Sequence, residues 1–391
     1  MPRAIDGTAL PAQQSGALLA AVLAAAALAS AVSPQGARML ALLALGVLLG
    51  ATLYFASFGF TSAYRRLLEG HGAGAVRAQL LMLAAGTALF APVLAQGGWF
   101  GREVVGAVAP AGVPVAIGAF LFGIGMQLAG GCGSGTLYAA GGGQLRTAVT
   151  LAAFCAGSFW ASLHMEAWSE LPALEPLALG ELLGWPVAVG LQLAVFAGLY
   201  ALLGRWRGGA DGDSVPPGSS GIKRVLRGPW PLAAGALALA VLNLLTLIVA
   251  GHPWSITWAF ALWGAKAARV VGWSPEGDPF WSADFQHSAL DASVFADVTS
   301  VMDLGLMLGA FTAAGLAGGF HFRFDPSPRA VLTAALGGLA MGYGARIAFG
   351  CNIGAFFSGV ASTSLHGWLW IAAALPGCWV GLQLLRRIRP E

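Results

Sequence analysis

The chain has 391 residues, of which 57% are hydrophobic and only 9% are charged. A soluble domain carries about 25% charged residues, so this composition excludes an ordinary soluble protein and indicates a polytopic membrane protein. The formal charge of +3 is too small to indicate a nucleic-acid-binding protein.

Runs of about 20 apolar residues, long enough to cross a bilayer as helices, recur along the whole chain. We expect about nine or ten transmembrane helices, near residues 16–33, 39–58, 78–96, 113–131, 145–164, 184–204, 230–250, 300–320, 330–349 and 367–385. A further run, 254–272, contains Lys266 and Arg269 and is interpreted as either a tilted span or a partial, interfacial helix. The fold class predicted is therefore an all-α polytopic integral membrane protein.

The distribution of Lys and Arg predicts the orientation, because these residues gather on the cytoplasmic side of membrane proteins. The segments 59–77, 205–229 and 321–329 and the C-terminus carry basic residues and are predicted to be cytoplasmic. The segments 166–183 and 273–303 contain acidic residues but no Lys or Arg, and they are predicted to be external.

A Gly/Ser/Pro-rich segment divides the chain near its middle. We expect residues 208–228 to be a flexible cytoplasmic linker between an N-terminal membrane half, 1–207, and a C-terminal membrane half, 229–391. With an offset of 219, Gly118, Gly123, Gly125, Cys132, Gly135 and Trp160 fall on Gly337, Gly342, Gly344, Cys351, Gly354 and Trp379. Residues 46–50 also resemble residues 305–309. Since the predicted orientation makes 113–131 run inward and 330–349 run outward, we expect pseudo-symmetric, inverted halves, a construction typical of transporters.

Each half contains a glycine-cysteine turn that follows an apolar run, at 131–132 and at 350–351. Irregular backbone at membrane depth is tolerated only where it is buried in protein or lines a cavity. The turns therefore predict broken or re-entrant helices around a site. The first amides after such a break present N–H donors and the positive end of the helix dipole, which favour an anion.

The side chains beside the two turns extend this candidate anion site. Asn352, Ser134 and Thr136 add donors, and Arg346 is a rare membrane-embedded charge that can attract an anion. The predicted substrate-binding residues are Gly131, Cys132, Ser134, Thr136, Arg346, Gly350, Cys351, Asn352 and Gly354. No catalytic residue, metal site or cofactor is predicted.

Competing interpretations stay open for several of these residues. Gly and Ser next to helix contacts are often packing residues, and Arg346 is equally compatible with snorkelling to an interface. We interpret Cys155 and Cys378 as small apolar packing residues. No CxxC spacing indicates zinc, and the spacing neither supports nor excludes a disulfide. The tryptophans at 254, 258, 263, 368 and 370 are predicted to form aromatic belts.

The block 342–355 (GYGARIAFGCNIGA), which continues through Ser358-Gly359 to residues 364–368 (SLHGW), resembles the signature of the YeeE/YedE family. Residues 305–310 and the turn at 130–132 fit the same family, and the resemblance covers essentially the whole chain. It implies a multi-pass protein of the bacterial inner membrane that imports thiosulfate, which pore cysteine thiols bind by hydrogen bonds and pass inward. It also implies a separate, small cytoplasmic sulfur-carrier protein (TusA-like) as partner, besides the membrane lipid.

The chain departs from the family pattern at one position. Cys132 and Cys351 match two of the family's three relay cysteines, whereas Gly59 stands where the first is expected. Either two thiols suffice, with Ser57, Thr61 or Ser62 donating instead, or the substrate is a different sulfur or selenium species.

Two other classes of protein remain as alternatives. A membrane sulfurtransferase would carry a persulfide on Cys132 or Cys351, and it would need a base or cation beside the thiolate. A structural or assembly subunit would leave both cysteines replaceable. No phosphate-binding Gly-x-x-x-x-Gly-Lys-Ser/Thr sequence occurs, so direct use of ATP is not expected.

Overall fold

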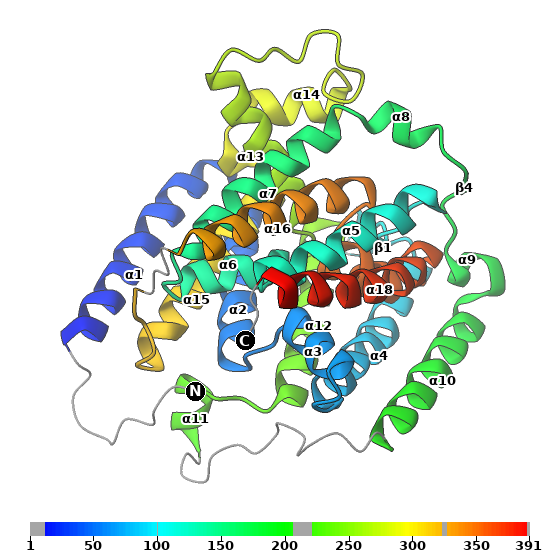
Figure 1. Ribbon diagram of the computed structural model, residues 1–391, viewed down its shortest axis with the longest axis horizontal. Helices are drawn as coiled ribbons and strands as arrows, with labels where there is room; N and C mark the ends of the chain where they lie inside the picture. Colours follow the sequence, from blue (N-terminus) through cyan, green and yellow to red (C-terminus); the bar gives the residue numbers. More distant parts are fainter. Residues whose placement is uncertain (1–11, 100, 206–220, 323–326, 389–391) are drawn as a thin grey trace.

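The computed structural model describes residues 12–99, 101–205, 221–322 and 327–388 (Figure 1). Helices form nearly all the regular structure of these residues. The strands are four two-residue segments in two antiparallel pairs: β1 (Gly98–Trp99) with β2 (Arg102–Glu103), and β3 (Ala111–Gly112) with β4 (Ala173–Leu174). The predicted all-α fold class is confirmed.

Within the described residues, 9 helical segments are long and apolar enough to cross a membrane. They contain α1 (Ala12–Val32), α2 (Ala37–Phe55), α4 (Gly74–Ala95), α5 (Val113–Ala129), α10 (Trp185–Gly204), α12 (Leu232–Ala250), α15 (Val298–Leu316), α16 (Pro328–Ile347) and α18 (Leu365–Ile388). The prediction of a polytopic membrane protein with about nine or ten spans is therefore confirmed.

Two helices are shorter than the predicted spans. Helix α7 (Arg146–Ser162) has 17 residues and occupies the expected run 145–164. Helix α13 (Thr257–Val270) has 14 residues, about 21 Å at 1.5 Å per residue, whereas the hydrocarbon core is about 30 Å thick. The segment 254–272 is thus a partial helix rather than a tilted span.

The remaining helices are short connections and caps. They are α3 (Phe60–Leu68), α6 (Gly133–Gly141), α8 (Met165–Ser169), α9 (Leu179–Leu183), α11 (Ile222–Arg227), α14 (Asp284–Asp291) and α17 (Ser358–Ala361), with 3-10 turns at Ser33–Gln35 and Val294–Ala296 and a π-helix at Asn352–Phe357. Most of the predicted linker 208–228 lies outside the described residues, and its described end contains α11. The division into two halves stays a prediction.

A glycine seam joins α5 and α16. A Cβ added to Gly118 would lie 2.5 Å from the carbonyl oxygen of Gly344, and one added to Gly125 would lie 2.6 Å from that of Gly337. Small residues permit such close backbone approach in membrane helix pairs. Residue numbers along the seam run in opposite directions, so the two helices are antiparallel. The offset of 219 relates Gly118 to Gly337 and Gly125 to Gly344. It therefore converts the first contact into the second, as expected for inverted repeats.

The same offset relates the helices that flank this seam. Helix α18 packs on α5 through Gly377, which faces the carbonyl of Phe120, and α7 packs on α16 through Gly157, which faces the carbonyl of Leu339. The offset relates Phe120 to Leu339. The offset also relates Trp160 to Trp379. These two side chains are 55% and 54% exposed on the outer surface.

The similarity between residues 46–50 and 305–309 has a different explanation. These segments of α2 and α15 contact each other, with Gly46 facing the backbone of Met302 and Gly50 facing that of Leu306. The residue numbers rise together, so this pair is parallel. The similarity therefore reflects one local contact between glycine-bearing helices and does not follow the antiparallel relation of α5 and α16.

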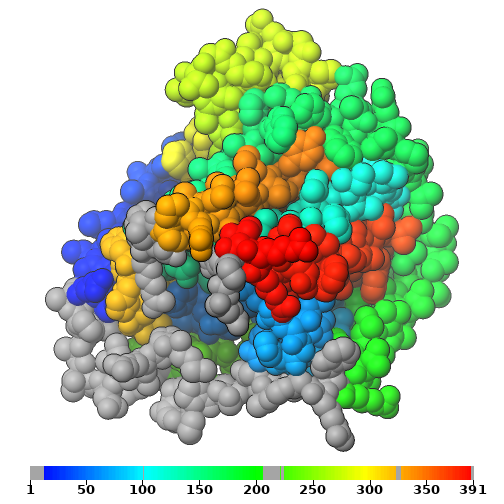
Figure 2. All heavy atoms as spheres, in the orientation of Figure 1, coloured from blue at the N-terminus to red at the C-terminus, as the bar shows by residue number. Residues whose placement is uncertain are grey.

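The periphery fits a lipid-facing surface. Helices α1 and α10 lie at opposite edges of the molecule (Figure 1), and they expose large apolar side chains such as Leu23 and Val187. Figure 2 shows the segment that contains α13 and α14 as a projection at one end. Its core is a small cluster around Trp281 and Leu262. Lys266 and Arg269 of α13 donate to the carbonyl of Leu290 on α14, which explains two cations on an otherwise apolar helix.

Candidate functional site

The first break follows α5. Gly130 adopts a left-handed conformation (φ 80°), which ends the helix, and Cys132 then becomes the N-cap residue of α6. The Thr136 amide donates to the Cys132 carbonyl at 2.8 Å, and the Ser134 hydroxyl lies 3.4 Å from the Cys132 sulfur. The backbone amides of Ser134 and Gly135 interact with the same sulfur. The thiol is thus held at the N-terminal end of a short helix.

The second break repeats this arrangement after α16. Phe349 and Gly350 have φ values of 58° and 146°, and the Trp370 indole donates to the Gly350 carbonyl at 3.2 Å. Cys351 is the N-cap residue of the π-helix, whose Ile353 amide points at the Cys351 sulfur at 3.5 Å. The amide of Gly354 interacts with the same sulfur. The predicted pair of broken helices is present.

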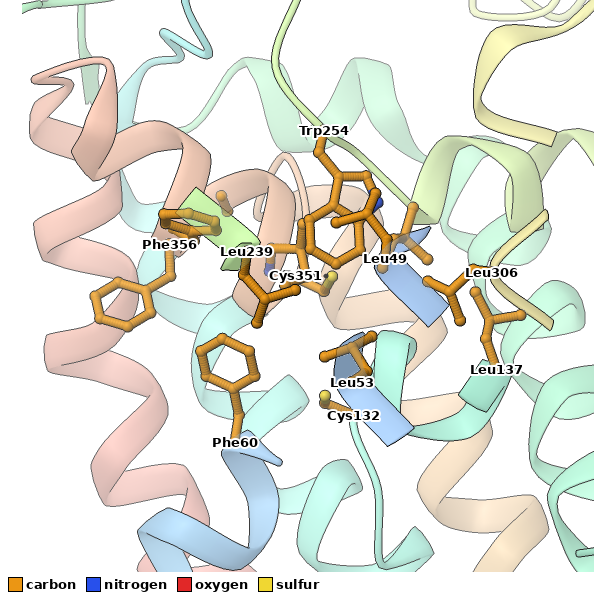
Figure 3. Close-up of a cluster of buried hydrophobic side chains, with 14 of the residues drawn as sticks. Leu49, Leu53, Phe60, Cys132, Leu137, Leu239, Trp254, Leu306, Cys351 and Phe356 are labelled. Carbon is orange, nitrogen blue, oxygen red and sulfur yellow. Dashed lines mark hydrogen bonds between the residues drawn. The ribbon is translucent and has the colours of Figure 1, made fainter. Parts of the chain in front are cut away.

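The two turns meet in one buried place. A Cβ added to Gly133, next to Cys132, would lie 3.4 Å from the Cys351 sulfur, and one added to Gly135 would lie 3.5 Å from the Cys132 sulfur. Both cysteines belong to the same buried cluster (Figure 3), and they are 2% and 0% exposed. All four cysteines are free thiols, so the disulfide left open by the sequence is not formed.

The walls around the thiols are apolar and closed. Leu49, Leu53, Phe60, Leu239 and Leu306 surround them in Figure 3, and each is buried. The structure therefore shows an occluded site.

Several buried polar side chains near the two turns have few or no hydrogen-bond partners. The hydroxyl of Thr61 and the indole nitrogen of Trp254 lack a hydrogen-bond partner among the described residues, and the buried side chains of Tyr64 and Asn352 have no partner there beyond each other. Each unsatisfied buried group costs about 1–3 kcal/mol. Tyr64 interacts with Asn352 and with Cys132, so Tyr64 and Asn352 lie at the same site as the first thiol. Such unpaired donors are expected where a polar ligand binds.

Tyr64 and Trp254 were missed by the sequence analysis. The segment that carries Trp254 is fastened to the second break, because the Trp254 carbonyl accepts from the Ser358 hydroxyl at 2.8 Å and its amide donates to Asn243 at 2.8 Å. The assignment of Trp254 and Trp370 to aromatic belts is wrong, since they are 1% and 0% exposed. Only knowledge of the tertiary contacts separates such tryptophans from interfacial ones.

The position of the missing third thiol is surrounded by hydroxyls. A Cβ on Gly59 would lie 2.9 Å from the Ser62 hydroxyl and 3.7 Å from that of Tyr138. Tyr138 in turn interacts with Cys132. Of the predicted substitutes, Thr61 is buried without a partner for its hydroxyl, whereas Ser57 and Ser62 are exposed, and the Ser62 hydroxyl donates to the Gly59 carbonyl at 3.2 Å.

The other predicted residues occupy different places. Arg346 lies at the end of α16, with its guanidinium 5.1 Å from the centre of the Phe280 ring. It is covered by the α13–α14 projection, which argues against the snorkelling interpretation. Gly354 lies beside the second thiol, where a Cβ would be 3.4 Å from the Ser255 hydroxyl, and Gly131 faces the first turn of α6.

Two arginines cap the carbonyl end of α5 just before the first break. Arg65 of α3 donates to the carbonyl of Gln127 at 3.2 Å, and Arg146 donates to those of Leu128 and Ala129 at 3.3 and 3.1 Å. These cations offset the negative end of the α5 dipole. No group of three or more His, Cys, Asp or Glu side chains that could hold a metal occurs in the part of the chain the structure describes.

Antiparallel broken helices that bring two polar turns to one occluded site define the architecture of a multi-pass membrane transporter. Consistent with this class, the family model "Sulphur transport" matches residues 55–380. The chain belongs to this family, the YeeE/YedE family.

The similar proteins include named transporters. The chain is 31% identical to "Thiosulfate transporter TsuA" of Spirochaeta thermophila over 288 residues, 69% of this chain and 77% of that protein. It is 26% identical to "Thiosulfate transporter TsuA" of Escherichia coli over 289 residues, 70% and 75% of the two chains. It is 32% identical to "Probable transporter YedE" of Escherichia coli over 154 residues, which are 39% of this chain and only 37% of that protein.

Proposed function

We propose that this transporter imports thiosulfate, or a similar small sulfur-containing anion, across the bacterial inner membrane. The observation that carries the proposal is the meeting of Cys132 and Cys351, each at the start of a short helix, in one buried site. The names of the relatives support the class of substrate. The hydroxyls around Gly59 in place of a third thiol favour, as the second candidate, a different sulfur or selenium species.

The chemistry of the site suits such an anion. A small dianion must lose water to cross, and burying a charge without partners costs several kcal/mol or more. Thiols, hydroxyls and amides offset this cost by hydrogen bonding. They do so without the full opposite charge that would hold the ion too tightly for release. A thiol also suits a soft terminal sulfur atom better than a hydroxyl does.

The proposed path follows the predicted orientation. The anion is attracted by Arg346 at the external side, binds the thiol of Cys351 and then that of Cys132, and leaves past the hydroxyl of Tyr138 towards Arg65. Each thiol binds the anion by a hydrogen bond, and no covalent bond forms. On the cytoplasmic side we expect a separate small sulfur-carrier protein to accept the substrate.

Growth on thiosulfate as the sole sulfur source tests the proposal, in a bacterial host that lacks its own thiosulfate uptake. We expect the wild-type chain to restore growth, and Cys132→Ala and Cys351→Ala to lose it at equal membrane expression. Cys155→Ala, a cysteine outside the two turns, is the matched control. Full growth of both turn variants would refute the relay. Covalent sulfur on either purified cysteine, detected by mass spectrometry, would favour a sulfurtransferase instead.

A further inference from the structure

A buried carboxyl group lies beside the site and has no part in the proposed relay. Asp303 of α15 is 0% exposed, and neither of its carboxylate oxygens has a hydrogen-bond partner among the described residues. Met302 and Leu306, on either side of Asp303 along α15, belong to the same buried cluster as Cys132 and Cys351, and Asp303 interacts electrostatically with Cys351. It therefore lies close enough to the thiol site to respond to an anion bound there.

The neighbouring cations do not neutralise Asp303. The charged and titratable groups on the elements packed against α15 are Arg38 and Tyr54 of α2, Tyr138 of α6, Lys266 and Arg269 of α13, and Arg224 and Arg227 of α11, together with Asp297 at the start of α15. Lys266 donates to two carbonyls of the α14 region, and Arg269 pairs with Asp291 at 2.8 Å. A fully buried carboxylate without a cation is costly, and in practice such a group takes up a proton.

A row of polar groups leads from the predicted external end of α15 to this carboxyl. Asp297, Ser300 and Asp303 are spaced three residues apart on one helix, so they lie on one face. Asp297 accepts from the Ser300 amide at 2.7 Å, and the Ser300 hydroxyl accepts from the Trp263 indole at 2.9 Å. Asp297 is only partly buried, whereas Ser300 and Asp303 are fully buried. The row thus places Asp303 one turn below Ser300, on the face that begins at the partly buried Asp297.

We propose that Asp303 binds and releases one proton in each transport cycle, so that the protein co-transports protons with its sulfur-containing anion. This inference rests on the proposed function. As the anion binds near Cys351, its charge disfavours the ionised form of Asp303, so anion binding and proton binding favour each other. The carboxylate takes a proton from the external side when the anion enters and gives it to the cytoplasm when the anion leaves. No electrons are transferred.

Uptake of [35S]thiosulfate into proteoliposomes tests the coupling, with the membrane potential clamped by potassium and valinomycin. An interior one pH unit more alkaline than the outside should raise wild-type accumulation about tenfold for each proton carried. Asp303→Asn should still take up thiosulfate down its own gradient but lose this stimulation, whereas Asp303→Glu should keep part of it. The exposed Asp291→Asn is the matched control and should respond as the wild type does.

The outcomes separate the two proposals. Wild-type uptake that does not respond to the pH gradient would overturn the coupling and leave the proposed function intact. An unchanged response in Asp303→Asn would overturn the role of Asp303 and also leave the proposed function intact. No thiosulfate uptake by the wild type under any gradient would overturn the proposed function. Infrared spectroscopy of the substrate-free protein gives an independent measurement: a protonated-carboxyl band should be present in the wild type and absent in Asp303→Asn. A band unchanged by the substitution would overturn the role of Asp303.

Discussion

Gly133 lies beside the Cys351 thiol, and we expect its replacement to narrow the path without disturbing the fold. It follows Cys132 directly and begins α6. The nearest atoms to an added Cβ are the Cys351 sulfur at 3.4 Å and a methyl carbon of Ile256 at 3.7 Å. Both are ordinary contact distances, so Gly133→Ala fits. The larger Gly133→Val places further carbon atoms in the space beside the Cys351 thiol.

The expected magnitudes differ between folding and transport. Alanine in a helix is more stable than glycine by about 0.5–1 kcal/mol, so unfolding temperature should stay the same or rise slightly. An overpacked site costs about 1–3 kcal/mol per inserted group. If this cost destabilises only the state in which an anion lies beside the Cys351 thiol, uptake should fall about 5- to 150-fold. Gly133→Val should lie at the upper end of this range.

The assay is [35S]thiosulfate uptake by purified protein in liposomes, together with thermal unfolding in detergent. Gly190→Ala on α10 is the matched control, because an added Cβ there meets nothing within 4 Å. Stable Gly133→Ala and Gly133→Val proteins with wild-type uptake would refute the idea that the anion passes between the two turns.

Three further substitutions test the seam, the external entrance and the second break. Gly125→Ala should lower the unfolding temperature, because its Cβ would lie 2.6 Å from the Gly337 carbonyl oxygen. An unchanged melting curve would show that α5 and α16 are not packed this closely. Arg346→Gln should raise the KM for external thiosulfate more than it lowers the maximal rate, because a long-range charge acts mainly on attraction; an equal KM at low salt would contradict this role. Trp370→Phe removes the hydrogen bond to the Gly350 carbonyl and should lower the free energy of unfolding by about 1 kcal/mol, measured by denaturant unfolding. An unchanged free energy of unfolding would show that this bond does not hold the turn.

The sequence was most informative where backbone constraints are local. A glycine-cysteine turn after an apolar run indicates a break in a helix, so the breaks at Cys132 and Cys351 were predicted from their surroundings in the chain. The offset of 219 related the glycines of α5 to those of α16, but it did not predict that these two helices pack against each other, which the structure shows.

The sequence was least informative where the answer depends on contacts between distant segments. Tyr64 and Trp254 line the site only because α3 and the segment before α13 fold against the second break. The length of α13 was also left open, since Lys266 and Arg269 take on a structural role only through α14. The similarity of residues 46–50 to 305–309 was assigned to the repeat, whereas the structure shows a direct contact between parallel helices.

The central claim is that two thiols carry a small sulfur-containing anion through an occluded site. Its most direct test is [35S]thiosulfate uptake into liposomes by the wild type, Cys132→Ala and Cys351→Ala, with Cys155→Ala as control. A hydrogen bond to a charged group contributes about 1.5–3 kcal/mol, so each turn variant should lose about 10- to 150-fold in rate while the control keeps it. Saturable wild-type uptake that both turn variants retain in full would contradict the account.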